Sequence, residues 1–97
     1  SAFGGSSAGR CMYYVYVLQS LKDKRFYTGF TENLEERIRQ HNNKEEPATK
    51  ARVPFKLVYF EGCLLKKDAI ARERQLKSGK GKKYLRIRIK HYLEDLE

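Results

Sequence analysis

Met12-Tyr13-Tyr14-Val15-Tyr16-Val17-Leu18 is a tight run of apolar and aromatic residues near the start of this chain. Its β-branched and aromatic residues are typical of a β-strand. Because successive side chains in a strand point to opposite faces, Tyr14 and Tyr16 share one face and Val15 and Val17 share the other. A polar turn follows at 19–24, and residues 25–29 form a second strand that ends at Gly29. The short separation predicts an antiparallel hairpin.

Beyond the hairpin, the pattern changes to that of a helix over 31–41. Thr31 is the expected N-cap, and three glutamates lie near the positive end of the helix. Residues 43–54 are charged and contain both prolines, so they indicate an exposed loop. Residues 55–61 form a third strand, and Gly62 should break it.

The C-terminal third is predicted to be helical, with one ambiguity. Residues 65–77 form a helix that Ser78-Gly79 ends. In residues 80–96, apolar and basic residues alternate over 85–90 as in a strand. The wider apolar spacing of four, three and four residues favours a helix. The expected order is therefore β-β-α-β-α-α, an α/β (α+β) fold with a small three-stranded sheet flanked by helices.

Length and charge narrow the classes of function. A chain of 97 residues with 21 Lys and Arg against 12 Asp and Glu carries a net charge of +9. We expect one domain at 12–97 and a polyanionic partner, with nucleic acid first and a solvated basic surface as the alternative. No stretch approaches the ~20 apolar residues that cross a membrane.

The N-terminus and the cysteines carry smaller signals. Residues 1–11 are rich in Gly and Ser, and we expect a disordered remnant that precedes Met12 as the natural start. Cys11 and Cys63 form no metal-type spacing and no disulfide framework. A reducing cytoplasm is the simplest location for such a chain.

Two polar side chains lie on the apolar stripe of the first helix. Leu34 and Ile38 mark that stripe, and Arg37 and His41 each follow one of them at i+3. An arginine and an imidazole thus face the sheet. The structural alternative is that Arg37 extends along the edge and His41 satisfies the end of the helix.

Glu73 repeats this pattern in the second helix, where apolar residues surround it. A carboxylate in such a place is paired or binds a metal, and a salt bridge with Lys77 at i+4 is the alternative. Tyr16 and Tyr27 add phenols from the hairpin, and Tyr27 lies two residues before Gly29. Together these residues supply a proton acceptor, a cation for phosphate and a metal ligand, which a phosphodiester hydrolase needs.

A basic stretch runs from Lys77 to Tyr92, with seven Lys or Arg residues and no acid. It indicates either a surface that contacts the phosphate backbone or a solvated helix face. The candidate nucleic-acid-binding residues are Lys77, Lys80, Lys82, Lys83 and Arg86.

The motifs resemble those of the GIY-YIG nuclease superfamily over residues 12–90, most of all its short stand-alone bacterial branch. Tyr14-Val15-Tyr16 stands for the first motif and Tyr27-Thr28-Gly29 for the second. Residues 33–41 resemble the helix that carries the family's Arg and His, and residues 71–73 the segment that carries its metal-binding Glu. Tyr14 stands where the first motif has its glycine, and no Asn follows Glu73 as in larger members.

This resemblance implies a three-stranded antiparallel sheet and cleavage of DNA phosphodiesters with one divalent ion, Mg²⁺ or Mn²⁺. By position, Tyr16 helps to activate the attacking water, directly or with His41, and Tyr27 binds the water or the phosphate. Arg37 stabilises phosphate charge, and Glu73 holds the metal. We expect a monomeric endonuclease of low sequence specificity, with DNA repair as one setting. The alternatives are a binding module that cuts poorly or not at all, and a protein that binds RNA.

Overall fold

The computed structural model describes residues 12–96, so the expected disorder of residues 1–11 lies outside the described residues. The elements in chain order are β1 (Tyr13–Ser20), β2 (Phe26–Thr31), α1 (Leu34–Asn42), the 3₁₀ turn η1 (Lys50–Arg52), β3 (Phe55–Cys63), α2 (Lys66–Lys77), α3 (Gly79–Arg88) and α4 (Lys90–Asp95). Among these elements there is no helix of the length and apolar character needed to span a membrane.

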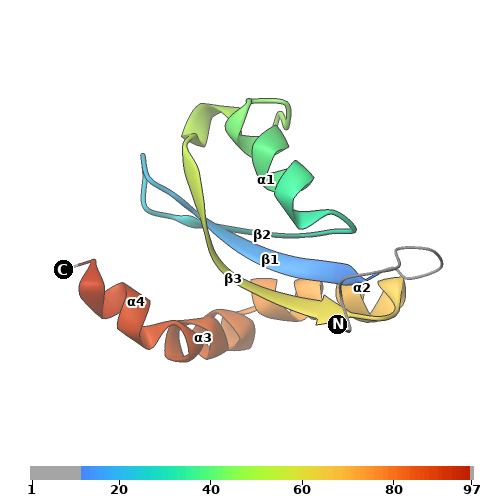
Figure 1. Ribbon diagram of the computed structural model, residues 1–97. Helices are drawn as coiled ribbons and strands as arrows, with labels where there is room; N and C mark the ends of the chain where they lie inside the picture. Colours follow the sequence, from blue (N-terminus) through green and yellow to red (C-terminus); the bar gives the residue numbers. More distant parts are fainter. Residues whose placement is uncertain (1–11, 97) are drawn as a thin grey trace, which may run out of the picture.

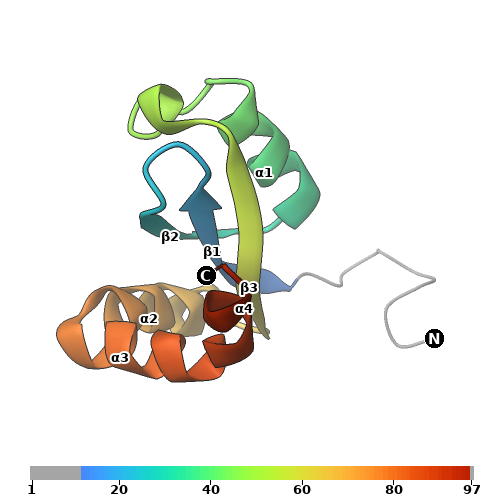
Figure 2. The same ribbon diagram turned by 90° about the vertical axis from the view of Figure 1, so that its left-hand side faces the viewer.

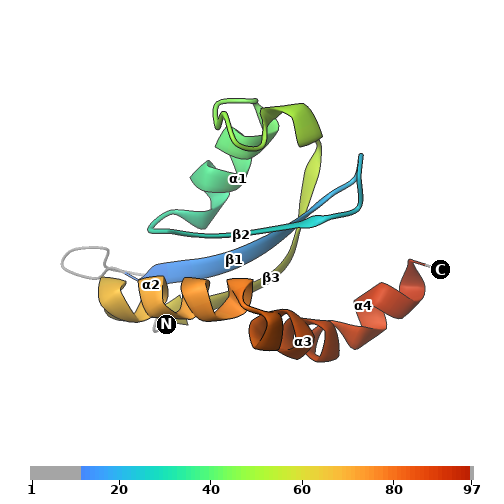
Figure 3. The ribbon, with the colours of Figure 1, turned by 180° about the vertical axis from the view of Figure 1, so that it is seen from behind.

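The three strands form one antiparallel sheet in the order β2-β1-β3. The long strand β1 lies in the centre, and β2 is an edge strand (Figure 1). Tyr16 of β1 is paired with Gly29 of β2. Helix α1 covers one face of the sheet, and α2, α3 and α4 cover the other (Figures 2 and 3). The expected antiparallel sheet flanked by helices is therefore confirmed.

The alternation of β1 builds a core on each face. Tyr16 and Leu18 pack toward α1 in a cluster with Phe55. Val15 faces α2, and Val17 packs against apolar side chains of the C-terminal helices. Every residue of β1 from Val15 to Ser20 is buried, because both faces of this central strand are covered. Burial of a large side chain contributes about 1.5–3 kcal/mol, so β1 provides much of the stability.

Four details differ from the sequence-based expectations. Strand β2 does not end at Gly29, and Gly62 does not break β3. The N-cap of α1 is Asn33, whose side chain accepts a hydrogen bond from the Glu36 amide, while the Thr31 hydroxyl accepts one from the Asn33 amide. Residues 80–96 are helical, and a break at Ile89 divides them into α3 and α4. The order is thus β-β-α-β-α-α-α.

Candidate active site

The centre of the site is a buried phenol and imidazole pair between β1 and α1. Tyr16 is 1% exposed and His41 is 0% exposed. The Tyr16 Oη lies 2.9 Å from His41 Nε2. The Tyr27 ring packs edge-on against the imidazole, with centroids 5.1 Å apart. Helical spacing turns His41 toward the sheet, and strand alternation turns Tyr16 toward α1, so the two meet in the core.

Arg37 reaches the same phenol from one turn earlier in α1. Its Nε donates to Tyr16 Oη at 3.3 Å, and its Nη2 donates to Glu46 Oε2 at 2.7 Å. A third hydrogen bond runs from Nη1 to Gln40 Oε1 at 3.1 Å. The Arg37 side chain is 28% exposed, so one part of the guanidinium is fixed by these contacts and another part faces solvent.

Thr49 completes the network on the far side of the imidazole. Its Oγ1 lies 2.8 Å from His41 Nδ1, and the residue is 0% exposed. The same hydroxyl donates to the Glu46 carbonyl at 3.5 Å. Neither Thr49 nor Glu46 was predicted from the sequence. Both lie in the charged segment after α1, where no periodicity distinguishes a functional residue from a solvated one.

One arrangement of protons satisfies all the donors and acceptors of this network, and we assign that arrangement. A guanidinium can only donate, so Tyr16 Oη accepts from Arg37 and its own proton is directed to His41 Nε2. Because the Thr49 hydroxyl donates to a carbonyl, it accepts the Nδ1 proton of His41. His41 is thus a neutral imidazole with its free lone pair on Nε2.

The electrostatic setting stabilises the same protonation states. Burial raises the pKa of Tyr16, although the hydrogen bond and positive charge of Arg37 oppose that shift. Burial, followed by the positive charge of Arg37, lowers the pKa of His41. At neutral pH the phenol therefore keeps its proton and the imidazole stays uncharged. This pair can move a proton from Tyr16 to His41 when the phenol receives one from outside.

Gly29 makes room for the phenol on the edge strand. A Cβ at this position would lie 2.6 Å from Tyr16 Oη and 2.8 Å from its Cζ. Real Cβ atoms do not approach other atoms that closely, so a side chain here would displace the ring. The glycine thus keeps the phenol oxygen in place beside the edge strand.

Glu73 lies on α2, which packs on the face of the sheet opposite α1, and its side chain is 19% exposed. Lys77 Nζ lies 3.4 Å from its Oε2, so the expected i+4 ion pair is present. The negative charge of Glu73 also contributes, after burial and the other neighbours, to the raised pKa of Tyr16. The carboxylate is therefore within electrostatic range of the phenol.

The residues fit one kind of metal site. Within residues 12–96, no three His, Cys, Asp or Glu side chains gather where they could hold an ion. An ion bound in this part of the chain would therefore need ligands besides these side chains. Mg²⁺ commonly binds through one or two carboxylates, with waters and substrate phosphates as its other ligands. Glu73 supplies one carboxylate, which is the smallest number of protein ligands that this mode requires.

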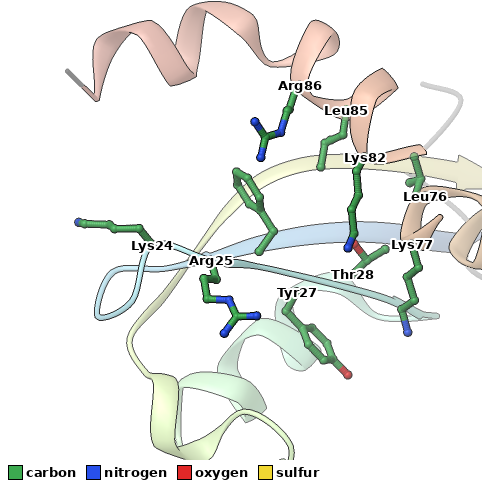
Figure 4. Close-up of a pocket in the computed structure, with 10 residues that line it drawn as sticks. Lys24, Arg25, Tyr27, Thr28, Leu76, Lys77, Lys82, Leu85 and Arg86 are labelled. Carbon is green, nitrogen blue, oxygen red and sulfur yellow. The ribbon is translucent and has the colours of Figure 1, made fainter. Parts of the chain in front are cut away.

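The structure divides the five basic candidates of the C-terminal stretch into two groups. Lys77, Lys82 and Arg86 line a cavity beside β2, together with Lys24 and Arg25 of the preceding turn (Figure 4). Lys80 and Lys83 are exposed on α3 and do not line this cavity.

Comparison with known proteins identifies the family of the chain. The family model of the GIY-YIG catalytic domain matches residues 12–86. The chain therefore belongs to the GIY-YIG catalytic domain family, whose nucleases act on nucleic acid and generally use a divalent metal. The resemblance inferred from the motifs is thus confirmed.

The curated relatives place the chain more narrowly. It is 49% identical over 67 residues to a UPF0213 protein of Clostridium perfringens, covering 68% of this chain and 71% of the relative. It is 37% identical to a UPF0213 protein of Staphylococcus saprophyticus, covering 77% of this chain and 92% of the relative. A solution structure of a UPF0213 protein from Bacillus halodurans matches with 35% identity and a TM-score of 0.47, covering 76% of this chain and 81% of that one.

Proposed function

We propose that this protein is a metal-dependent endonuclease that hydrolyses DNA phosphodiester bonds with low sequence specificity. The observation that supports this proposal is the environment of Tyr16 Oη, which contacts His41 Nε2 at 2.9 Å and Arg37 Nε at 3.3 Å. A tyrosine that is buried only as part of the core needs one hydrogen-bond partner for its hydroxyl. The Tyr16 hydroxyl has two: an imidazole that can accept its proton and a guanidinium of the kind that binds phosphate.

The network provides a route for the proton of the attacking water. As the water oxygen bonds to phosphorus, its proton passes to Tyr16 Oη, and the phenol proton passes to His41 Nε2. Thr49 accepts a hydrogen bond from the Nδ1–H group of His41 throughout. The imidazole therefore does not rotate while it becomes charged. The P–O ester bond then breaks, and the leaving oxygen takes a proton from solvent. Tyr27 packs beside this pair and can hydrogen-bond the water or the phosphate.

Arg37 is the group that stabilises phosphate charge in this proposal. A guanidinium has five N–H donors, and three of them are used by Tyr16, Gln40 and Glu46. Two donors therefore remain for phosphate oxygens, on a side chain whose exposed part faces solvent. Removal of one such donor from a transition state typically lowers the rate by about 10²–10³.

Glu73 is the residue that would hold the Mg²⁺ or Mn²⁺ ion. A bound ion of this kind neutralises charge on the phosphate and on the leaving oxygen. The carboxylate is paired with Lys77, whose side chain is 52% exposed, and is itself 19% exposed. Lys77 also lines the cavity beside β2, so it can contact the DNA backbone once the ion binds.

Nicking of supercoiled plasmid in the presence of Mg²⁺ or Mn²⁺ tests the proposal. We expect the wild type to nick and Glu73→Gln to lose nearly all activity, because an amide is a much weaker ligand for a hard cation. Glu94→Gln is the matched control, since it removes the same charge from an exposed position on α4. If all three proteins nicked no more than buffer alone, the endonuclease proposal would be wrong. The alternative, a module that binds nucleic acid without cutting it, would then be favoured.

A further inference from the structure

A cavity of about 480 Å³ lies beside the edge strand β2, between that strand and the α2–α3 junction (Figure 4). Phe26, Tyr27 and Thr28 line it from the strand, and Leu76 and Leu85 line it from the helices. Among the described strands β2 pairs with β1 alone, and its residues 26–28 border the cavity. Its size is in the range of pockets that bind small ligands.

The cavity is strongly cationic. Among the described residues, five basic side chains and no acidic side chain line it; the five are Lys24, Arg25, Lys77, Lys82 and Arg86. Among the ion pairs of residues 12–96, only Lys77 of these five has a carboxylate partner. Four positive charges thus border one small space without a counter-charge. An anion with several phosphate groups would neutralise them.

The walls between these cations are apolar and aromatic. Leu76 and Leu85 are 1% and 4% exposed and close the inner end of the cavity. The half-buried ring of Phe26 flanks the strand side, while the ring of Tyr27 packs against His41 at the α1 side of the strand. An inorganic anion gains nothing from such walls, whereas an unpaired base can stack on an aromatic ring. A base pair inside a duplex cannot reach these rings, because both of its faces are stacked on its neighbours.

Two residues that line the cavity, Tyr27 and Lys77, also contact residues of the candidate active site. Tyr27 packs against His41. Lys77 pairs with Glu73. Figure 4 shows Lys82 extending from α3 toward β2, while Tyr27 and Lys77 extend past the strand toward the α1 side. A strand of nucleic acid can therefore pass from the reacting phosphate around the sheet edge into the cavity.

We propose that this cavity binds a single-stranded segment of DNA that adjoins the phosphate to be cut. The proposal rests on the endonuclease function proposed above and specifies its substrate, which is DNA with an overhang, flap or gap. The cations of the turn and of α3 hold the backbone of the segment, and the aromatic walls stack its unpaired bases. An intact duplex would meet only the cations at the rim.

Equilibrium binding measured without metal tests this proposal apart from any cutting. Fluorescence anisotropy in the presence of EDTA would compare a labelled oligothymidylate of about 12 nucleotides, the same length of duplex, and the matching single-stranded RNA. We expect the single-stranded DNA to bind at least about fivefold more tightly than the duplex, which corresponds to one stacked base. Duplex or RNA bound as tightly as the oligothymidylate would overturn the proposal.

Two pairs of substitutions on one helix localise the binding. Lys82→Ala with Arg86→Ala removes two cavity cations, and Lys80→Ala with Lys83→Ala removes the same charge outside the cavity. We expect the first pair to weaken single-strand binding about tenfold and to lower the salt slope by about 1.4, or about 0.7 for each lost contact. Equal losses in the two double variants would refute a built site and indicate only general electrostatic attraction.

Phe26→Leu tests the aromatic wall, since leucine preserves most of the apolar packing against the C-terminal helices. We expect weaker binding of the oligothymidylate with an unchanged salt slope, because stacking releases no counterions. Wild-type affinity in this variant would contradict the stacking part of the proposal. None of these binding assays needs cleavage. A failure of the single-strand proposal can therefore be distinguished from a failure of the endonuclease proposal, which an absence of nicking would show.

Discussion

Substitution of Gly29 by alanine probes how closely the candidate site depends on the strand beside it. The added Cβ would lie 2.6 Å from Tyr16 Oη, 2.8 Å from its Cζ and 3.3 Å from its Cε2. The ring is 1% exposed and is enclosed by β1 and α1, so it has little free space to enter. The φ of Gly29 lies outside the left-handed region that disfavours alanine, so the clash with the phenol is the main effect.

The expected loss of stability follows from overpacking. Forcing an extra methyl group into a packed core typically costs about 1–3 kcal/mol. For a domain of this size, each kcal/mol lowers the melting temperature by about 4–8 °C. The phenol must also move away from β2, which changes the 2.9 Å hydrogen bond to His41 and the 3.3 Å one from Arg37. The nicking rate of the folded variant should therefore fall as well, and by more than the loss of folded protein would explain.

Gly79→Ala is the matched control, because an added Cβ there meets no atom within 4 Å. Gly79 is the first residue of α3, where alanine is at least as favourable as glycine. Thermal unfolding followed by circular dichroism, together with plasmid nicking, compares the two variants with the wild type. If Gly29→Ala kept both the melting temperature and the nicking rate of the control, the inference that this glycine positions Tyr16 would be refuted.

Two further predictions concern His41. Thr49→Val leaves the Nδ1 proton of His41 without a buried partner, which should cost about 1–3 kcal/mol. It should also shift the ¹⁵N signals of the imidazole, while Thr49→Ser keeps both near wild type; unchanged signals in the valine variant would exclude the proposed tautomer. Because the pKa of His41 is lowered on folding, its contribution to stability is complete above about pH 6.5 and is lost as the pH falls toward the folded pKa. Urea unfolding between about pH 6.5 and 4.5 should show a slope of up to about 1.4 kcal/mol per pH unit that His41→Gln lacks, and an equal slope in the variant would contradict the assignment.

Much of the fold could be predicted because the relevant signals are local. The alternation of β1 assigned Tyr16 and Val15 to opposite faces, and the structure places them in separate core clusters. The i+3 spacing in the first helix placed Arg37 and His41 on the buried face, where they contact Tyr16. Periodicity reports such contacts because the backbone geometry of one element determines which side chains share a face.

The errors arose where a residue's usual effect was overridden by its neighbours. Gly29 and Gly62 were expected to end strands, yet both lie within strands because β1 pairs with each of them. At Gly62 the Met12 side chain occupies the space of a Cβ, and its Cε would lie 2.9 Å from such an atom. Glycine interrupts an isolated strand, but cross-strand hydrogen bonds and a neighbouring side chain can retain it in a sheet.

The parts of the site that the sequence did not indicate depend on contacts across the chain. Thr49 meets His41 only because the segment after α1 folds back over that helix. Lys24 and Arg25 join Lys82 and Arg86 around one cavity although they are far apart in sequence. No spacing rule connects such residues, so charge alone could not show which basic residues of the C-terminal stretch act together. The roles of all these residues remain predictions that the variants above test.

The buried network of Tyr16, His41 and Arg37 distinguishes an endonuclease from a module that only binds DNA better than the basic surface does. A module that only binds DNA needs cations at its surface, and it gains nothing from a phenol linked to a neutral imidazole inside the core. Burying those groups is costly unless each is satisfied, and among the described residues every buried side-chain nitrogen and oxygen has a partner. A network that served packing alone could have been replaced by apolar side chains at similar stability. Tyr16→Phe makes the distinction, because it removes the proton route while leaving the ring, the cavity cations and hence DNA affinity in place.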